Sequence, residues 1–269
     1  MDTSGPSQRL RSAARRLALT GEDPRSQELA ENLASVHERI DQAMNAAGRS
    51  DRPALIVVTK FFPAADVARL YRLGVRDVGE NRDQEAAAKA AEVRALLSAE
   101  NSAEPAAAGQ DLHWHFIGQL QSNKAKSVVG YADHLHSVDR ASLIKALTKT
   151  VEARSAAEVT CLIQVDLRDP LPADGRGGAA PEDISTLADA LEEAPGLRLG
   201  GLMAVAPLEE PPAPAFARLQ GLSETLRTRR PEADMISAGM SGDLEAAVAH
   251  GATHLRVGRD VLGERPLQR

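Results

Sequence analysis

One lysine directly follows a segment that has the composition of a buried strand. Lys60 comes after Leu-Ile-Val-Val-Thr at residues 55–59, and strands buried on both faces are typically continuous apolar runs of this kind. A lysine at the end of such a strand is partly desolvated, which favours the neutral, nucleophilic amine. The alternative is a lysine whose stem lies along the strand end while its ammonium reaches water. Because the chain has only six lysines, Lys60 is the first candidate for covalent chemistry.

Two glycine-containing loops toward the end of the sequence have the residues of a phosphate site. The first, Ser237-Ala238-Gly239-Met240-Ser241-Gly242-Asp243, leads from a predicted strand into a predicted helix. The N–H groups and the dipole at a helix N-terminus attract anions, and serine hydroxyls add donors. The second is Arg256-Val257-Gly258-Arg259, in which glycine lets the backbone approach a ligand closely. Either loop alone is typical of an ordinary turn, but with a strand-end lysine they predict a phosphorylated aldehyde or ketone bound as an imine.

Strand-like and helix-like segments alternate along most of the chain. After a helix predicted over residues 26–47, β-rich runs alternate with segments of helical periodicity. The eight predicted strands cover residues 55–59, 77–79, 113–117, 134–138, 160–165, 197–205, 234–237 and 254–257. This alternation is typical of a parallel sheet with right-handed crossovers, and eight such strands close into a barrel.

We therefore predict the α/β fold class, as a (β/α)8 TIM barrel with an extra N-terminal helix. A single domain over residues 26–269 would follow a disordered tail over residues 1–25, which are polar and lack a long apolar run. An open doubly wound sheet is the second choice, but Lys60-Phe61-Phe62-Pro63 replaces the glycine-rich turn expected after its first strand. Barrel enzymes bind ligands at the C-terminal ends of their strands, with phosphate sites after strands seven and eight. Lys60 and both loops should meet there.

The composition limits the class of protein. The 269 residues are 43% hydrophobic, with a formal net charge of −6, so the chain lacks the basic face of a dedicated nucleic-acid binder. No run approaches the roughly 20 apolar residues that cross a bilayer. The single cysteine, Cys161, excludes a disulfide framework and a cysteine-based zinc site. We expect a cytoplasmic protein that binds a small molecule and contacts neither nucleic acid nor membrane.

Several longer motifs resemble one known family. They are Val57-Val58-Thr59-Lys60, Gly79-Glu80-Asn81, the string His-Trp-His-Phe-Ile-Gly-Gln-Leu-Gln-Ser-Asn-Lys at residues 113–124, Gly201-Leu202-Met203-Ala204, Gly239-Met240-Ser241-Gly242-Asp243 and Arg256-Val257-Gly258. In these motifs the chain resembles the pyridoxal phosphate homeostasis proteins. These are single-domain barrels of the fold type III class, similar to the N-terminal domain of alanine racemases. The resemblance extends over residues 29–265.

The resemblance implies a cofactor and a set of residues that bind it. The cofactor is pyridoxal 5′-phosphate (PLP), held by Lys60 as an aldimine, with Asn81 beside its ring. Arg256 would approach the pyridine nitrogen, while His115 and Met203 would line the pocket. The phosphate would be bound by loop residues, namely Ser237, Gly239, Met240, Ser241, Gly258 and Arg259. Such proteins often carry threonine where this chain has Arg259, so one hydroxyl contact is lost here.

The resemblance also implies that the protein holds PLP in vitamin B6 homeostasis without turnover. An arginine at the pyridine nitrogen disfavours protonation of the ring and makes it a poorer electron sink. Racemases of this type take a second acid/base group from a C-terminal β-domain, and only about a dozen residues follow Val257 here. A PLP-dependent, racemase-like enzyme is the alternative. The expected partners are PLP and apo forms of PLP-dependent enzymes, and the chain would be a monomer or a weak homodimer.

A metal-dependent hydrolase barrel is a further alternative. Two His-x-His pairs, His113 with His115 and His134 with His136, each share one strand face, and such pairs can bind a catalytic metal. A metal site would leave Lys60 and both phosphate loops without a role. We therefore expect no metal site, with the histidines hydrogen-bonded to their neighbours.

Overall fold

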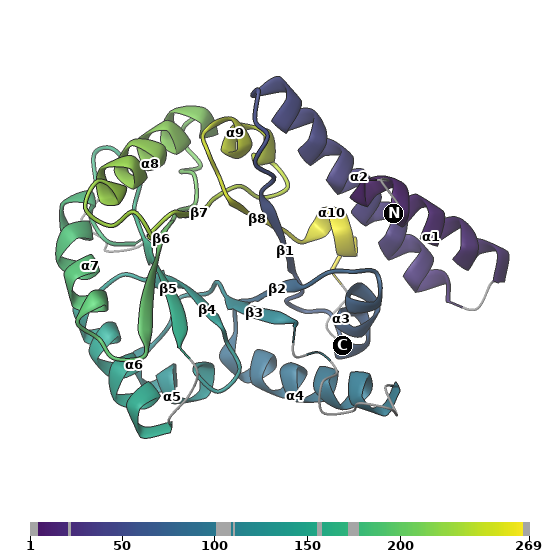
Figure 1. The fold of residues 1–269 in the computed structure, drawn as a ribbon, viewed down its shortest axis with the longest axis horizontal. Helices are drawn as coiled ribbons and strands as arrows, with labels where there is room; N and C mark the ends of the chain where they lie inside the picture. The colour runs from purple at the N-terminus through teal and green to yellow at the C-terminus, as the bar shows by residue number, and fades with distance from the viewer. Residues whose placement is uncertain are drawn as a thin grey trace.

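Eight parallel strands form a closed barrel (Figure 1). The computed structural model describes residues 5–20, 23–100, 109, 111–154, 158–171 and 178–265. The strands are β1 (Ala54–Val58), β2 (Asp77–Glu80), β3 (His113–Phe116), β4 (His134–Val138), β5 (Val159–Gln164), β6 (Leu197–Met203), β7 (Met235–Ser237) and β8 (His254–Val257). Because β1 pairs with both β2 and β8, the sheet has no free edge. The predicted barrel is confirmed.

Helices surround the ring of strands (Figure 1). They are α3 (Ala64–Arg72), α4 (Asp83–Glu100), α5 (Ala125–Val128), α6 (Ala141–Arg154), α7 (Ile184–Glu192), α8 (Pro212–Arg227), α9 (Leu244–Ala249) and α10 (Arg259–Leu262), with 3-10 turns at Ser122–Lys124 and Pro181–Asp183. Their inner faces carry leucines one turn apart, as at Leu143 and Leu147 of α6, both fully buried. No helix in the described ranges is long and apolar enough to span a membrane.

The barrel interior combines an apolar part with polar side chains. Leu162, Met203 and Met235 pack together as a small apolar cluster. The register of β6 against β5 shifts near Gly201, whose φ of 144° lies in a region that favours glycine. A Cβ there would lie 2.0 Å from the carbonyl oxygen of Met235, so only glycine fits.

Two helices precede the barrel, and the first corrects our expectation of a disordered tail over residues 1–25. They are α1 (Pro6–Thr20) and α2 (Pro24–Ala46), which lie side by side (Figure 1). Residues 1–4, 21 and 22 fall outside the described ranges. Leu10 and Ala14, one turn apart on α1, are 7% and 4% exposed. These few apolar side chains are sufficient to pack α1 because α2 supplies the surface on which they lie. The sequence of residues 1–25 alone did not reveal that surface.

Candidate functional site

A cavity of about 590 Å³ opens where β1 and β8 end. Its lining includes six of the eleven site residues proposed from the sequence: Lys60, Met240, Ser241, Arg256, Gly258 and Arg259. The barrel brings them together because the C-terminal ends of all its strands meet at one rim. The amine of Lys60, the buried guanidinium of Arg256 and the backbones of the two loops therefore face the same cavity.

Lys60 lies in an unusual backbone turn just beyond β1. The next residue, Phe61, has a φ of 71°, a left-handed conformation that is strained for a bulky side chain. Its ring lies 5.2 Å from the guanidinium carbon of Arg82 and 4.7 Å from that of Arg265. Burial lowers the pKa of Lys60, and the charges of Arg265 and Arg82 lower it further, against an opposing effect of Glu80. The neutral amine is thus less disfavoured here than for a lysine in water.

A buried ion pair fixes the strand ends beneath Lys60. Lys89 of α4 donates from Nζ to Oε1 of Glu80 at 2.6 Å and to the carbonyl oxygen of Thr59 at 2.8 Å. The Thr59 hydroxyl donates to the same Glu80 oxygen at 2.7 Å. Glu80 and Lys89 are only 1% and 9% exposed. Since Thr59 directly follows β1 and Glu80 ends β2, this network sets the position from which Lys60 enters the cavity.

The loop after β7 is closed by Asp243. The backbone N–H of Met240 donates to Oδ1 of Asp243 at 2.5 Å, and the Asp243 N–H donates to the Met240 carbonyl at 3.2 Å. Gly239 has a φ of 89°, and a Cβ there would lie 2.6 Å from the Cβ of Ala247. Within the described chain, the N–H groups of Ser241 and Gly242 have no acceptor. They remain available to an anionic ligand.

Arg39 of α2 joins the two loops at the cavity, and sequence reasoning missed it. Its guanidinium donates to the carbonyl oxygen of Ser241 at 3.0 Å and to Oδ2 of Asp260 at 2.5 Å. It also pairs with Glu245 of α9. The partners lie more than 200 positions from Arg39 in the sequence. No local motif marks such a contact, so only the fold could reveal it.

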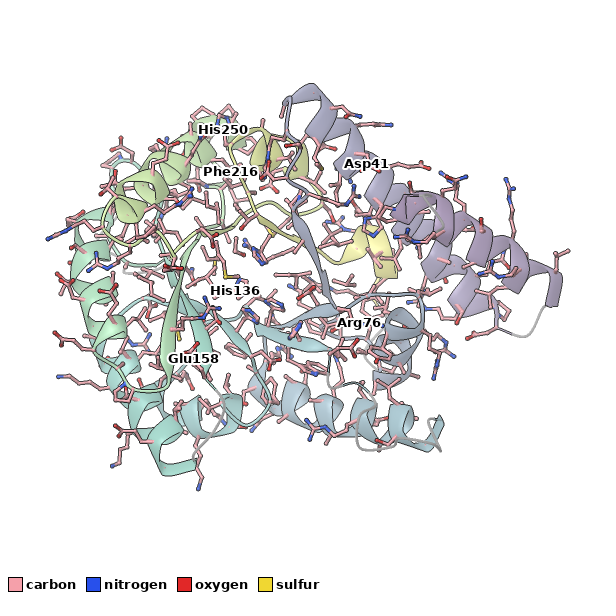
Figure 2. The ribbon with its side chains drawn as sticks, viewed as in Figure 1. Asp41, Arg76, His136, Glu158, Phe216 and His250 are labelled. Atoms are coloured by element: carbon pink, nitrogen blue, oxygen red, sulfur yellow. The ribbon has the colours of Figure 1, made fainter. Side chains whose placement is uncertain are left out.

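A chain of hydrogen bonds crosses the barrel interior and ends at the cavity. Oδ1 of Asp77 lies 3.0 Å from Nε2 of His115, whose Nδ1 lies 2.9 Å from Nε2 of His136. Nδ1 of His136 lies 2.9 Å from the hydroxyl of Ser237, which accepts a 2.6 Å bond from Arg256. Figure 2 shows His136 inside the ring of strands. Asp77 begins β2, so the chain runs from the N-terminal end of the barrel to the cavity.

The ends of this chain limit the direction of the hydrogen bonds in it. Arg256 can only donate, and an ionised Asp77 can only accept. One order that satisfies both ends has the Ser237 hydroxyl donating to His136, His136 to His115, and His115 to Asp77. In this order the imidazole of His136 is neutral, and burial holds the pKa of His136 well below its usual value. Burial also lowers the pKa of Arg256 to about 10, which leaves it charged at neutral pH.

The neutral histidines predict a loss of stability in mild acid. Burial lowers the pKa of His134 to about 3 and that of His254 to about 4, whereas an unfolded histidine titrates near 6.5. As the pH falls below about 6.5, the unfolded chain binds protons that the folded chain does not bind. Each such histidine therefore lowers the free energy of unfolding by up to about 1.4 kcal/mol per pH unit. The loss ends once the pH falls below the folded pKa values.

Urea denaturation at about pH 7.5 and about pH 5 tests this expectation, with a clearly lower midpoint predicted at the lower pH. Equal midpoints would contradict the buried, neutral state assigned to these histidines.

The histidine pairs form no metal site in the described residues. No three His, Cys, Asp or Glu side chains there are placed to hold an ion. Instead His115 and His136 bond to each other, while the rings of His115 and His134 stack at 4.3 Å. This arrangement lends no support to the hydrolase alternative.

The other five residues proposed from the sequence do not line the cavity. Ser237 and His115 belong to the interior chain, and Met203 to the apolar cluster. Gly239 shapes the turn after β7. Asn81 lines a neighbouring cavity of about 320 Å³, and its Oδ1 is buried without a donor among the described residues. These five residues therefore lie outside the lining of the Lys60 cavity.

Comparisons with known proteins agree on one family. The family model for the N-terminal domain of alanine racemase matches residues 32–266. The chain is 42% identical over 250 residues to the pyridoxal phosphate homeostasis protein of Mycobacterium tuberculosis, across 91% of this chain and 95% of that protein. The solved structure of PipY from Synechococcus elongatus with PLP bound is 33% identical, with a TM-score of 0.70, across 87% of this chain and all of that one.

A more distant structure shares the fold alone. Alanine racemase of Corynebacterium glutamicum is 16% identical, with a TM-score of 0.60, across 90% of this chain and 62% of that one. From the matching family model and the curated relatives, the chain belongs to the family of pyridoxal phosphate homeostasis proteins.

Proposed function

We propose that this protein binds PLP in the Lys60 cavity and holds it for PLP homeostasis, without turning over a substrate. The observation that carries the proposal is the meeting of Lys60, Arg256 and the two glycine-containing loops around one volume of about 590 Å³. This volume falls in the range of small-molecule sites, about 300–1,000 Å³. The solved PipY structure with PLP bound and the name of the curated relatives support it.

The donor groups of the cavity fit the chemical groups of PLP. Lys60 supplies the amine that would link to the aldehyde, and the N–H groups of Ser241 and Gly242, with the backbone at Gly258, would bind the phosphate. Arg256 would face the ring nitrogen. When bound, PLP supplies an aldehyde that condenses reversibly with amines and a ring that withdraws electrons.

The fixed position of Arg256 supports binding without turnover. Its guanidinium donates to the Ser237 hydroxyl at 2.6 Å and to the Ala204 carbonyl at 2.8 Å, and it is 4% exposed. A charged guanidinium at the ring nitrogen disfavours a proton there. The Ser237 hydroxyl and the Ala204 carbonyl hold this donating guanidinium in place.

The remaining lining residues offer no obvious second acid/base group. Apart from Lys60, the titratable side chains that line the cavity in the described structure are Arg256, Arg259, Arg265 and the exposed Glu264. Racemisation needs a proton donor and a proton acceptor on opposite faces of the substrate. The lining therefore favours a carrier over a racemase. In this proposal the protein works in the cytoplasm, and apo forms of PLP-dependent enzymes receive the cofactor.

Retention and turnover can be measured on the same preparation. We expect the full-length protein, incubated with PLP and passed through a desalting column, to retain one PLP per chain with a visible absorption band. Borohydride should remove the band, and L-alanine should racemise no faster than with free PLP. Failure to retain PLP would contradict the binding proposal, and multiple turnovers of alanine would establish the racemase-like alternative.

Arg39→Met tests whether Arg39 supports the two loops that line the Lys60 cavity. It removes the bonds to Ser241 and Asp260, so the loops lose their fixed spacing, and we expect PLP to dissociate about tenfold more readily, as for two lost hydrogen bonds. Arg227→Met, at an exposed position on α8, is the matched control. Fluorescence titration with PLP measures both. Equal affinities in the two variants would show that Arg39 does not support the site.

A further inference from the structure

A cavity of about 320 Å³, here called the α4 cavity, lies between the start of α4 and the segment that leads from β3 to α5. Six of its ten lining residues come from two motifs singled out in the sequence, Gly79-Glu80-Asn81 and the string at residues 113–124. Asn81 is the only one of the six that the sequence assigned to PLP, and it does not line the Lys60 cavity. The proposed PLP site therefore leaves these six side chains without a role.

Asp83, the first residue of α4, brings an unpartnered carboxylate to this cavity. The side chain is 9% exposed, and its Oδ1 is buried. No hydrogen-bond donor or cation in the described part of the chain contacts either of its oxygens. Burying a carboxylate without partners costs free energy. A ligand that supplied a positive donor here would offset that cost.

The surroundings of Asp83 favour a positive group. The Oδ1 atom of Asn81, in the same lining, is a buried acceptor with no donor among the described residues. Tyr131 shares with Asp83 the lining of a neighbouring cavity of about 640 Å³. Burial raises the pKa of Tyr131, and the negative charges of Asp83 and Glu80 raise it further. An ammonium group, which brings three donors and a positive charge, matches this end of the α4 cavity.

Lys124 supplies an unpartnered charge of the opposite sign from the other wall. It ends the 3-10 turn that follows β3, is partly buried, and forms no ion pair within the described ranges. The other two charged residues of the lining, Arg82 and Glu85, pair with each other at 3.1 Å. Asp83 and Lys124 therefore line one cavity without pairing across it.

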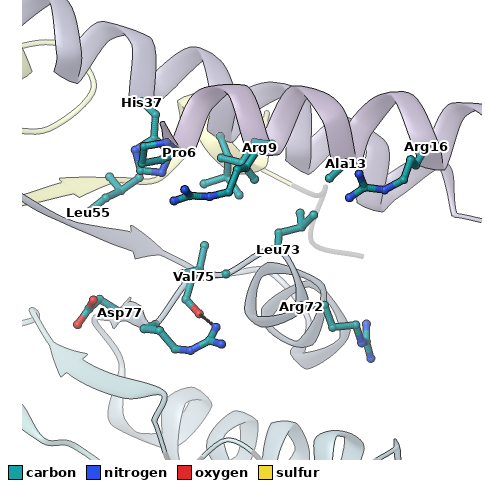
Figure 3. A pocket seen from close by; sticks show the side chains of 14 residues that line it. Pro6, Arg9, Ala13, Arg16, His37, Leu55, Arg72, Leu73, Val75 and Asp77 are labelled. Carbon is teal, nitrogen blue, oxygen red and sulfur yellow. Dashed lines mark hydrogen bonds between the residues drawn. The ribbon is translucent and has the colours of Figure 1, made fainter. Parts of the chain in front are cut away.

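The larger cavity beneath α1 differs in this respect (Figure 3). Four arginines line its volume of about 490 Å³. However, Arg9 and Arg72 have other partners in the described structure, and Arg76 pairs with Asp111 at 2.6 Å. Unpartnered groups of both signs thus distinguish the α4 cavity from it.

We propose that the α4 cavity binds a free amino acid in its zwitterionic form. The ammonium group of the ligand would donate to the carboxylate of Asp83, and its carboxylate would accept from Nζ of Lys124. Hydrogen bonds between charged groups are about twice as strong as those between neutral ones. Phe116 and Leu120 add an apolar part to the lining, and the volume of about 320 Å³ suits a small ligand. A ligand with a single charge would leave either Asp83 or Lys124 unpaired.

Calorimetric titration of the full-length protein with L-leucine tests the site. PLP is left out because its aldehyde reacts with amines, so the result does not depend on the Lys60 proposal. Two analogues, 3-methylbutylamine and 4-methylpentanoate, keep the leucine side chain with only one of its two charges. We expect saturable binding of L-leucine and about tenfold weaker binding, or less, of each analogue, as for one lost charged hydrogen bond.

Two variants assign the two charges. Asp83→Asn should weaken L-leucine binding about tenfold and remove its advantage over 4-methylpentanoate. Lys124→Met should weaken it similarly and remove its advantage over 3-methylbutylamine. A purely structural role of either residue would leave the preference for L-leucine over both analogues unchanged.

Matched controls make the same changes outside the α4 cavity. Asp183→Asn replaces an exposed aspartate at the start of α7 whose side chain makes no capping bond, and Lys145→Met replaces an exposed lysine on α6. Both should bind L-leucine as the wild type does. The proposal is overturned if L-leucine does not bind saturably in the millimolar range, or if either analogue binds the wild type as tightly. It is also overturned if the controls lose as much affinity as Asp83→Asn and Lys124→Met.

Discussion

Lys60→Ala is expected to abolish the stable retention of PLP and the visible absorption of the purified protein. Lys60 carries the only primary amine among the residues that line the cavity in the described structure. The nearby Lys89 cannot replace it, because its Nζ is bonded to Glu80 and Thr59. Without that amine, only reversible contacts to the phosphate and the ring remain. Absorption spectra after desalting measure the loss.

Two further variants make the result specific. Lys60→Arg keeps a positive charge but supplies no nucleophile, so it should lose the band as well. Lys126→Ala, at an exposed position outside the cavity, should keep it. If Lys60→Ala retained the band, the covalent assignment to Lys60 would be wrong.

Lys89→Met is expected to lower the free energy of unfolding by about 3–5 kcal/mol, as when one partner of a buried ion pair is removed. Glu80 is 1% exposed, and without Lys89 its carboxylate would be buried with the Thr59 hydroxyl as its only donor among the described residues. The same change would release the ends of β1 and β2 beneath Lys60. Urea denaturation at pH 7 measures the loss.

A double-mutant cycle separates the ion pair from general packing. Glu80→Leu combined with Lys89→Met removes both charges, so it should be much less destabilising than Lys89→Met alone. Glu158→Gln breaks an exposed pair with Arg198 and should change stability by less than about 1 kcal/mol. A Lys89→Met effect as small as that of Glu158→Gln would contradict the buried ion pair described here.

Much of the fold followed from local patterns in the sequence. The predicted strands over residues 134–138 and 254–257 match β4 and β8, because short runs that alternate polar and apolar residues between turns predict strands. The barrel rule then placed Lys60 and both loops at one rim, and the structure brings them to one cavity. These inferences needed only the order of elements and the residue at each strand end.

Other features depend on contacts between distant segments. The roles of Arg39, and of Lys89 in fixing Glu80, have no local signature, because each partner comes from a different element. Ser237 was expected at the phosphate, but in the structure its hydroxyl bonds to His136 and Arg256. A short strand followed by a loop does not reveal which of its residues point into the barrel. Similarly, α1 is stabilised by a partner surface on α2 that its own composition does not show.

The central claim is that one particular amine binds PLP. Borohydride reduction of the PLP-loaded protein, followed by proteolysis and mass spectrometry of the peptides, tests it directly. We expect the mass of one reduced cofactor on Lys60, with the other five lysines unmodified. Modification of Lys124 or Lys126 in place of Lys60, or labelling spread evenly over the lysines, would contradict it.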